Sequence, residues 1–327
     1  MKLFIVKRFV LFLITIWLVV TFTFVLIKCL PGDPFASDKA IHPQILNNLK
    51  AKYGMDKPVF TQYVIYLKNL TKGDLGISMQ YRNRSVVSII KRTFPVSLNL
   101  GIRALAIAVL MGGLLGVAAA FYRNKALDYT ALTVAVIGVS VPGFILGTLF
   151  QYFICFKLSA FIQYLTGIEY NIFPVTGWGS FRYTVIPSVV LAFGALGMII
   201  RMMRASMVDV LSQNYIVSAR AKGLSGKEIV SRHALKNAIL PVLSVLGPLM
   251  TSIIMGSFVI ENIFSIPGLG KYFVSSIKDK DYTMAIGLAL FTAFIVVLVN
   301  TLTDILYTFI DPRVRLGSGE TDLSSRI

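Results

Sequence analysis

Long apolar stretches that contain no charged residue recur along the chain, separated by shorter polar segments. A helix needs about 20 apolar residues to cross the hydrocarbon core of a bilayer. Because backbone polar groups in lipid must pair within their own segment, each such stretch predicts a helix. Core helices of a soluble protein rarely run so far without a charge. The predicted membrane spans are residues 9–27, 104–122, 129–156, 183–200, 237–260 and 282–303.

Basic residues in the short loops indicate the orientation, because Lys and Arg accumulate on the cytoplasmic side. They occur in the N-terminal tail, between the second and third spans, after the fourth span and in the C-terminal tail. We therefore expect both termini in the cytoplasm. The stretch 29–92 also carries ten basic residues, but loops of more than about 60 residues largely escape the rule. The first span is too long for a signal peptide and is predicted to stay uncleaved.

Composition supports a membrane protein and excludes several other classes. The chain of 327 residues is 56% hydrophobic and only 14% charged, whereas about a quarter of the residues in an ordinary soluble domain are charged. The net charge of +17 fits the orientation signal and anionic lipid headgroups. Nucleic-acid binding is not expected, because no basic face carries interleaved aromatic residues. The scattered Cys29, Cys155, His42 and His233 predict neither a metal site nor a cofactor.

A small insertion between the first two spans is predicted to contain two short helices. One runs from residue 43 to 53 and ends at Gly54, and the other runs from 58 to 72 and stops at Gly73. The predicted organisation is a tail and first span at 1–30 and an external insertion at 31–95. A five-helix membrane core at 96–311 with a cytoplasmic loop at 205–238 would follow, and then a cytoplasmic tail at 312–327.

Helix-unfriendly residues interrupt several spans. Pro142 and Gly143 lie in the third span and Pro248 in the fifth. These three are candidate hinges around a translocation path, although neighbouring helices also tolerate such kinks without any movement. Arg103 and Asp304 are ionisable residues that lie close to a membrane edge. Arg103 is near enough to extend its charge to the interface, and the alternative for either residue is a role in the translocation path. No series of buried carboxylates or histidines runs through the spans, which weakens a proton-coupled mechanism.

The basic loop after the fourth span has the pattern of a helix, a sharp turn and a second helix. Apolar positions predict the first helix at 207–222, and Gly223 is placed to end it with positive φ. Ser225 with Glu228 three residues later predicts a capping box that starts the second helix, which enters the fifth span at Pro241. Such a corner would move with the two spans that hold it. A passive amphipathic tether fits the periodicity equally well.

The sequence contains no motif for ATP binding or hydrolysis. An ATP-driven pump needs a phosphate loop of the form G-x-x-x-x-G-K-[ST], and the sequence contains none. No Ser/His/Asp or Cys/His constellation is visible either. The chain is therefore not expected to be an enzyme, and any energy source would lie on another polypeptide.

Several short motifs follow one another along the chain: LPGDP at 30–34, GDLGIS at 73–78, FPVSL at 94–98, ARAKGL at 219–224 with HALKNA at 233–238, FSIPGLG at 264–270 and DPR at 311–313. Together they resemble the membrane permease subunits of bacterial ABC importers for dipeptides and oligopeptides, the B-type member of the pair. The general motif of importer permeases has Glu-Ala-Ala before its glycine, whereas this chain has Val217, Ser218 and Ala219 at those positions. That departure leaves open which side chains make the coupling contact.

The resemblance implies an all-α, six-helix protein with the type I ABC importer permease fold, in the bacterial cytoplasmic (inner) membrane. It implies a second homologous permease subunit, two ATPase subunits below the membrane and an extracellular substrate-binding protein as partners. The segment toward that binding protein would include Pro31, Gly32, Asp33 and Pro34. The ATPase-coupling residues would be Ser218, Ala219, Arg220, Ala221, Lys222, Gly223, Leu224 and Ser225.

Other functions stay open at this stage. Related permeases for nickel or other metal chelates look much like those for peptides, although peptides are the expected cargo. A stand-alone secondary transporter would carry an internal repeat and ion-coupling residues inside the membrane, and neither is clear in the sequence. A membrane anchor that transports nothing would tolerate polar substitutions in the kinked spans.

Overall fold

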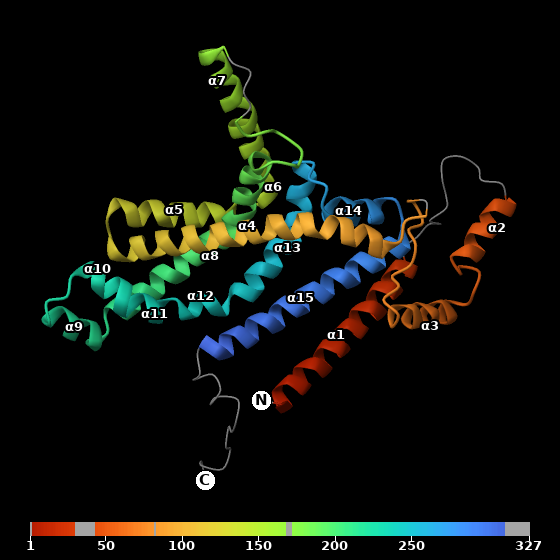
Figure 1. Ribbon diagram of the computed structural model, residues 1–327, viewed down its shortest axis with the longest axis horizontal. Helices are drawn as coiled ribbons and strands as arrows, with labels where there is room; N and C mark the ends of the chain where they lie inside the picture. Colours follow the sequence, from red (N-terminus) through yellow and green to blue (C-terminus); the bar gives the residue numbers. More distant parts are fainter. Residues whose placement is uncertain (1, 30–42, 82, 168–171, 311–327) are drawn as a thin grey trace, which may run out of the picture. The chain divides into compact units, whose positions relative to one another are not determined.

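The computed structural model describes residues 2–29, 43–81, 83–167 and 172–310, and these are almost entirely helical (Figure 1). The all-α membrane architecture predicted from the sequence is confirmed, and the sixth span matches its prediction at both ends. The helical segments long and apolar enough to cross a bilayer are Phe9–Cys29, Val86–Phe121, Gly143–Thr166, Phe181–Leu211, Leu246–Ile263 and Tyr282–Thr303.

The chain divides into two compact units. Unit 1 consists of Met1–Ser97 and Pro267–Val297, and unit 2 of Leu98–Ile266 and Leu298–Ile327. Two long helices, α4 (Val86–Phe121) and α15 (Tyr282–Ile310), contribute residues to both units.

Unit 1 gathers α1 (Lys2–Cys29), α2 (Pro43–Lys52), α3 (Val59–Leu70), α14 (Leu269–Lys278) and the first parts of α4 and α15. The two short helices predicted in the insertion are thus confirmed. Gly54 and Gly73 follow them with φ of 66° and 73°, the left-handed conformation that glycine adopts without a steric cost. The core of unit 1 is formed by Val20, Phe24, Ile27, Tyr282, Ile286 and Leu290.

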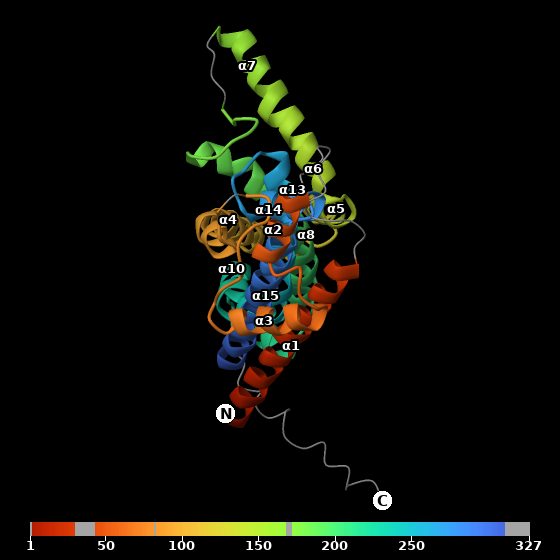
Figure 2. The ribbon, with the colours of Figure 1, turned by 90° about the vertical axis from the view of Figure 1, so that its right-hand side faces the viewer.

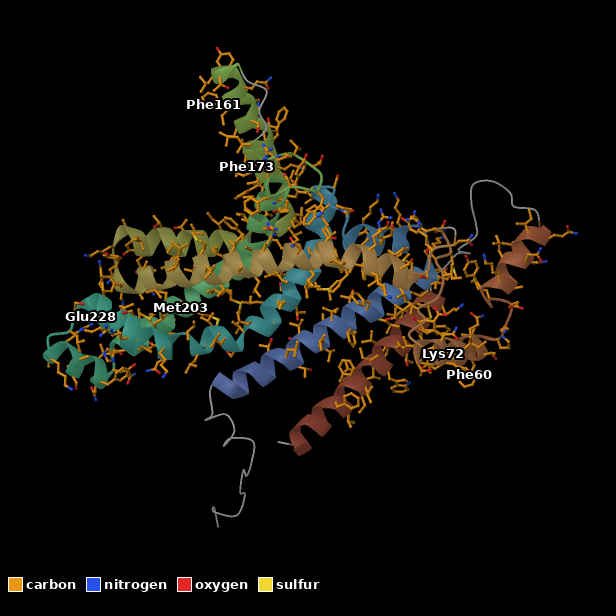
Figure 3. All side chains as sticks on the ribbon, viewed as in Figure 1. Phe60, Lys72, Phe161, Phe173, Met203 and Glu228 are labelled. Atoms are coloured by element: carbon orange, nitrogen blue, oxygen red, sulfur yellow. The ribbon has the colours of Figure 1, made fainter. Side chains whose placement is uncertain are left out.

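Unit 2 is built around α8 (Phe181–Leu211), which packs beside α5 (Ala126–Ser140). Small residues let the backbones approach closely. A Cβ atom added to Gly197 of α8 would lie 2.5 Å from the Ala135 carbonyl oxygen of α5, and one added to Gly116 of α4 would lie 2.7 Å from the Met203 Cβ of α8. Membrane helices favour such small-residue interfaces because packing drives their association. Figure 3 labels Met203 in this region.

The third predicted span is wrong in its extent. Residues 129–156 do not form one helix, because α5 ends at Ser140 and α6 (Gly143–Phe150) starts after a break. Val141 is extended with φ −88° and ψ 123°, as expected for a residue that precedes proline. The span that remains is Gly143–Thr166, which comprises α6, a π-helical stretch at Gln151–Lys157 and α7 (Leu158–Thr166). In both views α7 extends away from the rest of unit 2 (Figure 2).

The fifth predicted span also starts later than its apolar sequence indicates. Short helices α11 (Leu235–Ala238) and α12 (Leu240–Ser244) precede α13 (Leu246–Ile263), which is the span. Pro241 cannot donate the backbone hydrogen bond that would continue α11 into α12. Pro248 lies in the first turn of α13, and the interruption falls before it, at Val245.

Candidate functional site

The corner after the fourth span is a chain of short helices that begins at the end of α8. The single helix predicted at 207–222 is wrong: α8 continues to Leu211, and α9 (Asn214–Ala221) begins after a turn. The Ser212 hydroxyl donates to the Asp209 carbonyl at 2.7 Å, and the Gln213 amide donates to Val210 at 3.1 Å. Side chains such as those of Ser and Asn compete for backbone groups, which favours ends of helices over their interiors.

Gly223 ends α9 as predicted, with φ of 81°. The Gly223 amide donates to the Arg220 carbonyl at 2.9 Å and the Leu224 amide donates to the Ala219 carbonyl at 3.3 Å. This pair of hydrogen bonds is a Schellman motif, in which the glycine takes the left-handed position and the next apolar residue folds back onto the helix. Leu224 packs against the buried core that contains Ala219. The turn is therefore closed by backbone bonds and an apolar contact together.

The predicted capping box starts the next helix, α10 (Gly226–Glu228). The Ser225 amide donates to a Glu228 carboxylate oxygen at 3.1 Å, and the Glu228 amide donates to the Ser225 hydroxyl at 3.4 Å. Hydrogen bonds from the Ser225 side chain and amide hold the pKa of Glu228 below its ordinary value. A π-helical stretch, Ile229–Ala234, continues from α10 to α11. Figure 3 labels Glu228 at this corner.

Burial separates the predicted coupling residues into two groups. Ala219 is 7% exposed and belongs to the core, and Leu224 is half-buried. The remaining six are exposed: Ser218, Arg220, Ala221, Lys222, Gly223 and Ser225.

Two exposed apolar residues of α9 were missed by sequence reasoning. Val217 is 56% exposed and Tyr215 is 42% exposed, while Ile216 between them is fully buried. The apolar pattern predicted one continuous helix from residue 207. Because the chain turns at Ser212 instead, a different side of α9 faces outward. Val217 and Ala221 are one helical turn apart, so they share a surface.

Buried residues fix the corner to the fourth span. Ile216, Ile229 and Ala234 lie in the same core cluster as Met203 and Met207 of α8. The Asn237 amide group also donates to the Tyr215 hydroxyl at 2.9 Å, across the corner. Within unit 2, a displacement of α9 must therefore disturb the packing of the end of α8.

An ion pair ties α5 to α8 near the same end. The Arg204 Nε lies 2.5 Å from Asp128 Oδ1, and its Nη2 donates to Oδ2 at 2.8 Å. Asp128 is 1% exposed, and the Asn124 amide also donates to it at 2.9 Å. The hydrogen bonds from Arg204, followed by that from Asn124, lower the pKa of Asp128 to about 2. The carboxylate therefore stays ionised at any physiological pH.

The predicted hinge residues differ in their surroundings. Pro142 caps α6 at the break after α5, and Gly143 lines a cavity of about 250 Å³ together with residues of α5, α8 and α13, among them Gly138, Gly194 and Ser252. Pro248 instead lies inside a continuous first turn of α13. Open space therefore borders the break at Pro142.

In unit 1, a buried carboxylate holds the GDLGIS segment that the sequence singled out. Asp281 is 0% exposed and accepts the Ser78 hydroxyl and the amides of Met79 and Gln80, the latter two at 3.1 and 3.2 Å. It also accepts the Met284 amide at 3.0 Å, which caps the start of α15. One side chain thus joins the GDLGIS segment to the start of the sixth span. Sequence reasoning missed it, because Asp281 lies about 200 positions from its partners.

Arg103 makes its contacts within unit 2. Its Nε donates to the Asn99 amide oxygen at 2.7 Å, its Nη1 donates to the Thr184 hydroxyl at 2.9 Å, and its guanidinium lies 5.3 Å from the centre of the Phe181 ring. The residue therefore links α4 to the first turn of α8. The side chain of Asp304, residues Pro31 to Pro34 and the DPR segment at 311–313 lie outside what the structure describes.

Metal ligands do not cluster in the described ranges, where no group of three His, Cys, Asp or Glu residues could hold an ion. The described chain thus combines six membrane spans, small-residue helix packing and a corner fixed to the fourth span. These features define a multi-pass membrane component.

Comparison with known proteins identifies its family. The family described as "Binding-protein-dependent transport system inner membrane component" matches residues 112–316, and its N-terminal companion matches residues 1–101. The chain belongs to this family of bacterial transport components. It is 44% identical over 311 residues to the dipeptide transport system permease protein DppB of Bacillus subtilis, covering 95% of this chain and 97% of the relative.

A second relative and a solved structure extend the comparison. The oligopeptide transport system permease protein OppB of Haemophilus influenzae is 38% identical over 314 residues, covering 95% of this chain and 99% of the relative. An inward-facing structure of the MetNI methionine ABC transporter superposes with a TM-score of 0.53 and 18% identity, covering 68% of this chain and 96% of the other. That likeness supports the ABC importer permease fold.

Proposed function

We propose that this chain is the membrane-spanning permease subunit of an ATP-driven importer whose cargo is dipeptides or oligopeptides. The single observation that carries the proposal is the near full-length similarity to DppB and OppB, at 44% and 38% identity. Both relatives are named as permeases of peptide transport systems, so a nickel or metal-chelate cargo is not favoured. The cargo can be tested by uptake of radiolabelled dipeptides, longer peptides and chelated nickel in cells that lack the subunit and in cells that regain it.

The proposed assembly contains four further polypeptides. A second homologous permease would complete the translocation path, two ATPase subunits would bind on the cytoplasmic side, and an external binding protein would deliver cargo. This chain would hydrolyse no ATP, since it carries no phosphate loop. Reconstitution separates this function from a secondary transporter: uptake by this polypeptide alone, driven by an ion gradient, would contradict the proposal.

The orientation completes the proposal. Both termini and the corner at α9 to α11 would face the cytoplasm, following the distribution of Lys and Arg. Pro31, Gly32, Asp33 and Pro34 would lie outside, toward the binding protein. In a background with Cys29→Ser and Cys155→Ala, which removes the free native cysteines, labelling of Lys222→Cys with a membrane-impermeant maleimide should fail in intact cells and succeed in inverted vesicles. Labelling in intact cells would reverse the orientation.

We infer that the ATPase contact is the exposed surface of α9 and the turn after it. Val217 and Ala221 present an apolar spot one turn long, and Arg220 and Lys222 flank it with positive charge. Ala219 is buried and packs α9 against the core, which supports the exposed surface. Because ATP can shift a conformational equilibrium only through unequal affinity for its two states, the corner must be held differently when the ATPase dimer closes.

Two substitutions test this contact. Ala221→Glu places a charge on the proposed apolar spot and should reduce co-purification of the ATPase subunits, while the permease still inserts in the membrane. Gln213→Glu, at the exposed position just before α9, also adds one negative charge; it is the matched control and should leave co-purification unchanged. Equal retention of the ATPase by both variants would move the contact elsewhere.

We also propose that Pro142 and Gly143 form a hinge of the transport cycle. The break at Val141 leaves α5 and α6 joined without a continuous helix, and the adjacent cavity of about 250 Å³ gives side chains space to rearrange. Pro248 is a weaker candidate, since α13 continues through it. Pro142→Ala with Gly143→Ala would favour a continuous helix and should slow uptake without loss of ATPase binding. Uptake at the normal rate would remove the hinge from the mechanism.

A further inference from the structure

We propose that helix α3, in the insertion predicted to be external, is embedded in the leaflet that borders the C-terminal end of α1, with Phe60 and Val64 in contact with lipid acyl chains. In the proposed orientation this is the outer leaflet. The inference depends on α1 being a membrane span and not on the cargo or on the coupling site.

Side-chain contacts fix α3 against the last two turns of α1. The Tyr63 hydroxyl lies 2.7 Å from the Thr21 hydroxyl, and Lys28 Nζ donates to Gln62 Oε1 at 2.6 Å. The ring of Phe24, between these two contacts, lies 5.4 Å from that of Tyr63. Contacts at three successive levels of α1 determine the height of α3 along that span.

That height lies within the bilayer. The span of α1 ends at Cys29, and Thr21 precedes it by eight residues, a rise of about 12 Å at 1.5 Å per residue. Half of the hydrocarbon core is about 15 Å thick. A helix that reaches Thr21 through a tyrosine side chain and Lys28 through a glutamine therefore lies beside the outer half of the span and not in bulk water.

The side of α3 next to α1 does not account for all its apolar residues. Tyr63, Tyr66, Leu67 and Leu70 pack against the core of unit 1. Phe60 and Val64, one turn apart, are 75% and 46% exposed, and Figure 3 labels Phe60 on α3. A single exposed apolar residue is ordinary on any protein surface. A pair one turn apart at membrane depth is better explained by contact with lipid.

The surface of α1 at this height supplies the second argument. Phe22 and Leu26 are 64% and 65% exposed, as expected for the lipid-facing side of a span. The exposed pair on α3 belongs to a helix that contacts α1 at these same levels. Lys57 and Lys72 lie just beyond the two ends of α3 and are exposed, so their ammonium groups can reach phosphate headgroups while the helix stays in the interface.

Spin-label accessibility tests the proposal. In a background with Cys29→Ser and Cys155→Ala, since both native cysteines are free, single cysteines at Phe60, Val64 and Thr61 are labelled with a nitroxide. Thr61 is the matched control, because it neighbours Phe60 but is turned by about 100° around the helix. Leu18, 40% exposed within the α1 span, provides the lipid reference. The full chain is measured in nanodiscs, alone and in the assembled complex.

The expected result is a ratio of oxygen to nickel-chelate accessibility at 60 and 64 that is several-fold higher than at 61 and close to the ratio at 18. Collision with the nickel chelate at 60 and 64 as frequent as at 61 would place the helix in water and overturn the proposal. Oxygen access that disappears in the assembled complex would show that a partner subunit, not lipid, covers this side, and would overturn it too. Peptide uptake by the same variants reports separately on the proposed function.

Discussion

The carboxylate of Asp128 and the guanidinium of Arg204 form a two-point ion pair between α5 and α8, with the shorter contact at 2.5 Å. The pair lies at the end of α8 that leads into the corner with α9. Because the folded pKa of Asp128 is about 2, below the ordinary 3.8, its stabilisation is complete above pH 4. It is lost only as the pH falls toward 2, so the contribution should be constant from pH 5 to 8.

Replacing Asp128 by Asn should therefore destabilise the permease at neutral pH. The substitution leaves the Arg204 charge without its partner in a mostly enclosed place, and removing one member of a buried pair costs about 3 kcal/mol or more. Since Arg204 keeps 23% exposure, we expect roughly 2 kcal/mol after partial solvation. Thermal unfolding of the purified protein in detergent measures the effect.

Asp209→Asn is the control for that experiment, because Asp209 lies on the same helix but is exposed. It should leave the melting temperature unchanged. Equal melting temperatures of wild type and Asp128→Asn would show that the pair contributes nothing to stability.

Asp281→Asn should loosen the segment around Ser78. The amide can still accept some of the hydrogen bonds, but the charge that attracts three donors from that segment and the Met284 amide is lost. We expect a loss of about 1–3 kcal/mol and faster proteolysis near Ser78 in limited digestion. Asp279→Asn, two positions away and exposed, should digest like the wild type. Unaltered digestion of Asp281→Asn would mean that other contacts suffice to hold the segment.

Gly116→Ala and Gly113→Ala should behave differently although they lie on the same helix. A Cβ at Gly116 would meet the Ile200 carbonyl oxygen at 2.9 Å, in addition to Met203, whereas nothing lies within 4 Å of a Cβ at Gly113. Overpacking of this kind costs about 1–3 kcal/mol. Gly116→Ala should lower the melting temperature, and Gly113→Ala should leave it unchanged or slightly raised. Identical melting curves for both variants would contradict the close approach of α4 and α8.

Gly223→Val should uncouple transport while membrane insertion stays normal. Space is available for a side chain there, so the penalty comes from the backbone: φ of 81° costs an ordinary residue about 1–2 kcal/mol, and more for a β-branched one. Peptide uptake and peptide-stimulated ATP hydrolysis by the complex measure the coupling. Gly223→Asn, which tolerates positive φ better, should retain most activity. Full uptake by Gly223→Val would exclude the turn as the coupling element.

Local rules were sufficient wherever a single short segment decides the conformation. The turn at Gly223 and the box of Ser225 with Glu228 follow from residues within four positions of each other, and both are found as predicted. The sixth span is likewise correct at both ends, since its apolar run begins directly after Asp281 and contains no proline. Hydrophobicity alone was less reliable at the third and fifth spans, where proline interrupts a run that stays apolar on both sides.

The sequence by itself determined that the chain crosses a membrane in six helices and has a sharp basic corner after the fourth, because burial in lipid and helix capping act on neighbouring residues. Only the tertiary structure decided that Val217 rather than Ala219 faces outward on α9, that Arg204 meets Asp128 across 76 positions, and that α3 contacts α1 below its end. Those facts depend on how rigid helices pack against one another. Packing is settled by shape and by partners distant in the chain, which periodicity along one segment does not record.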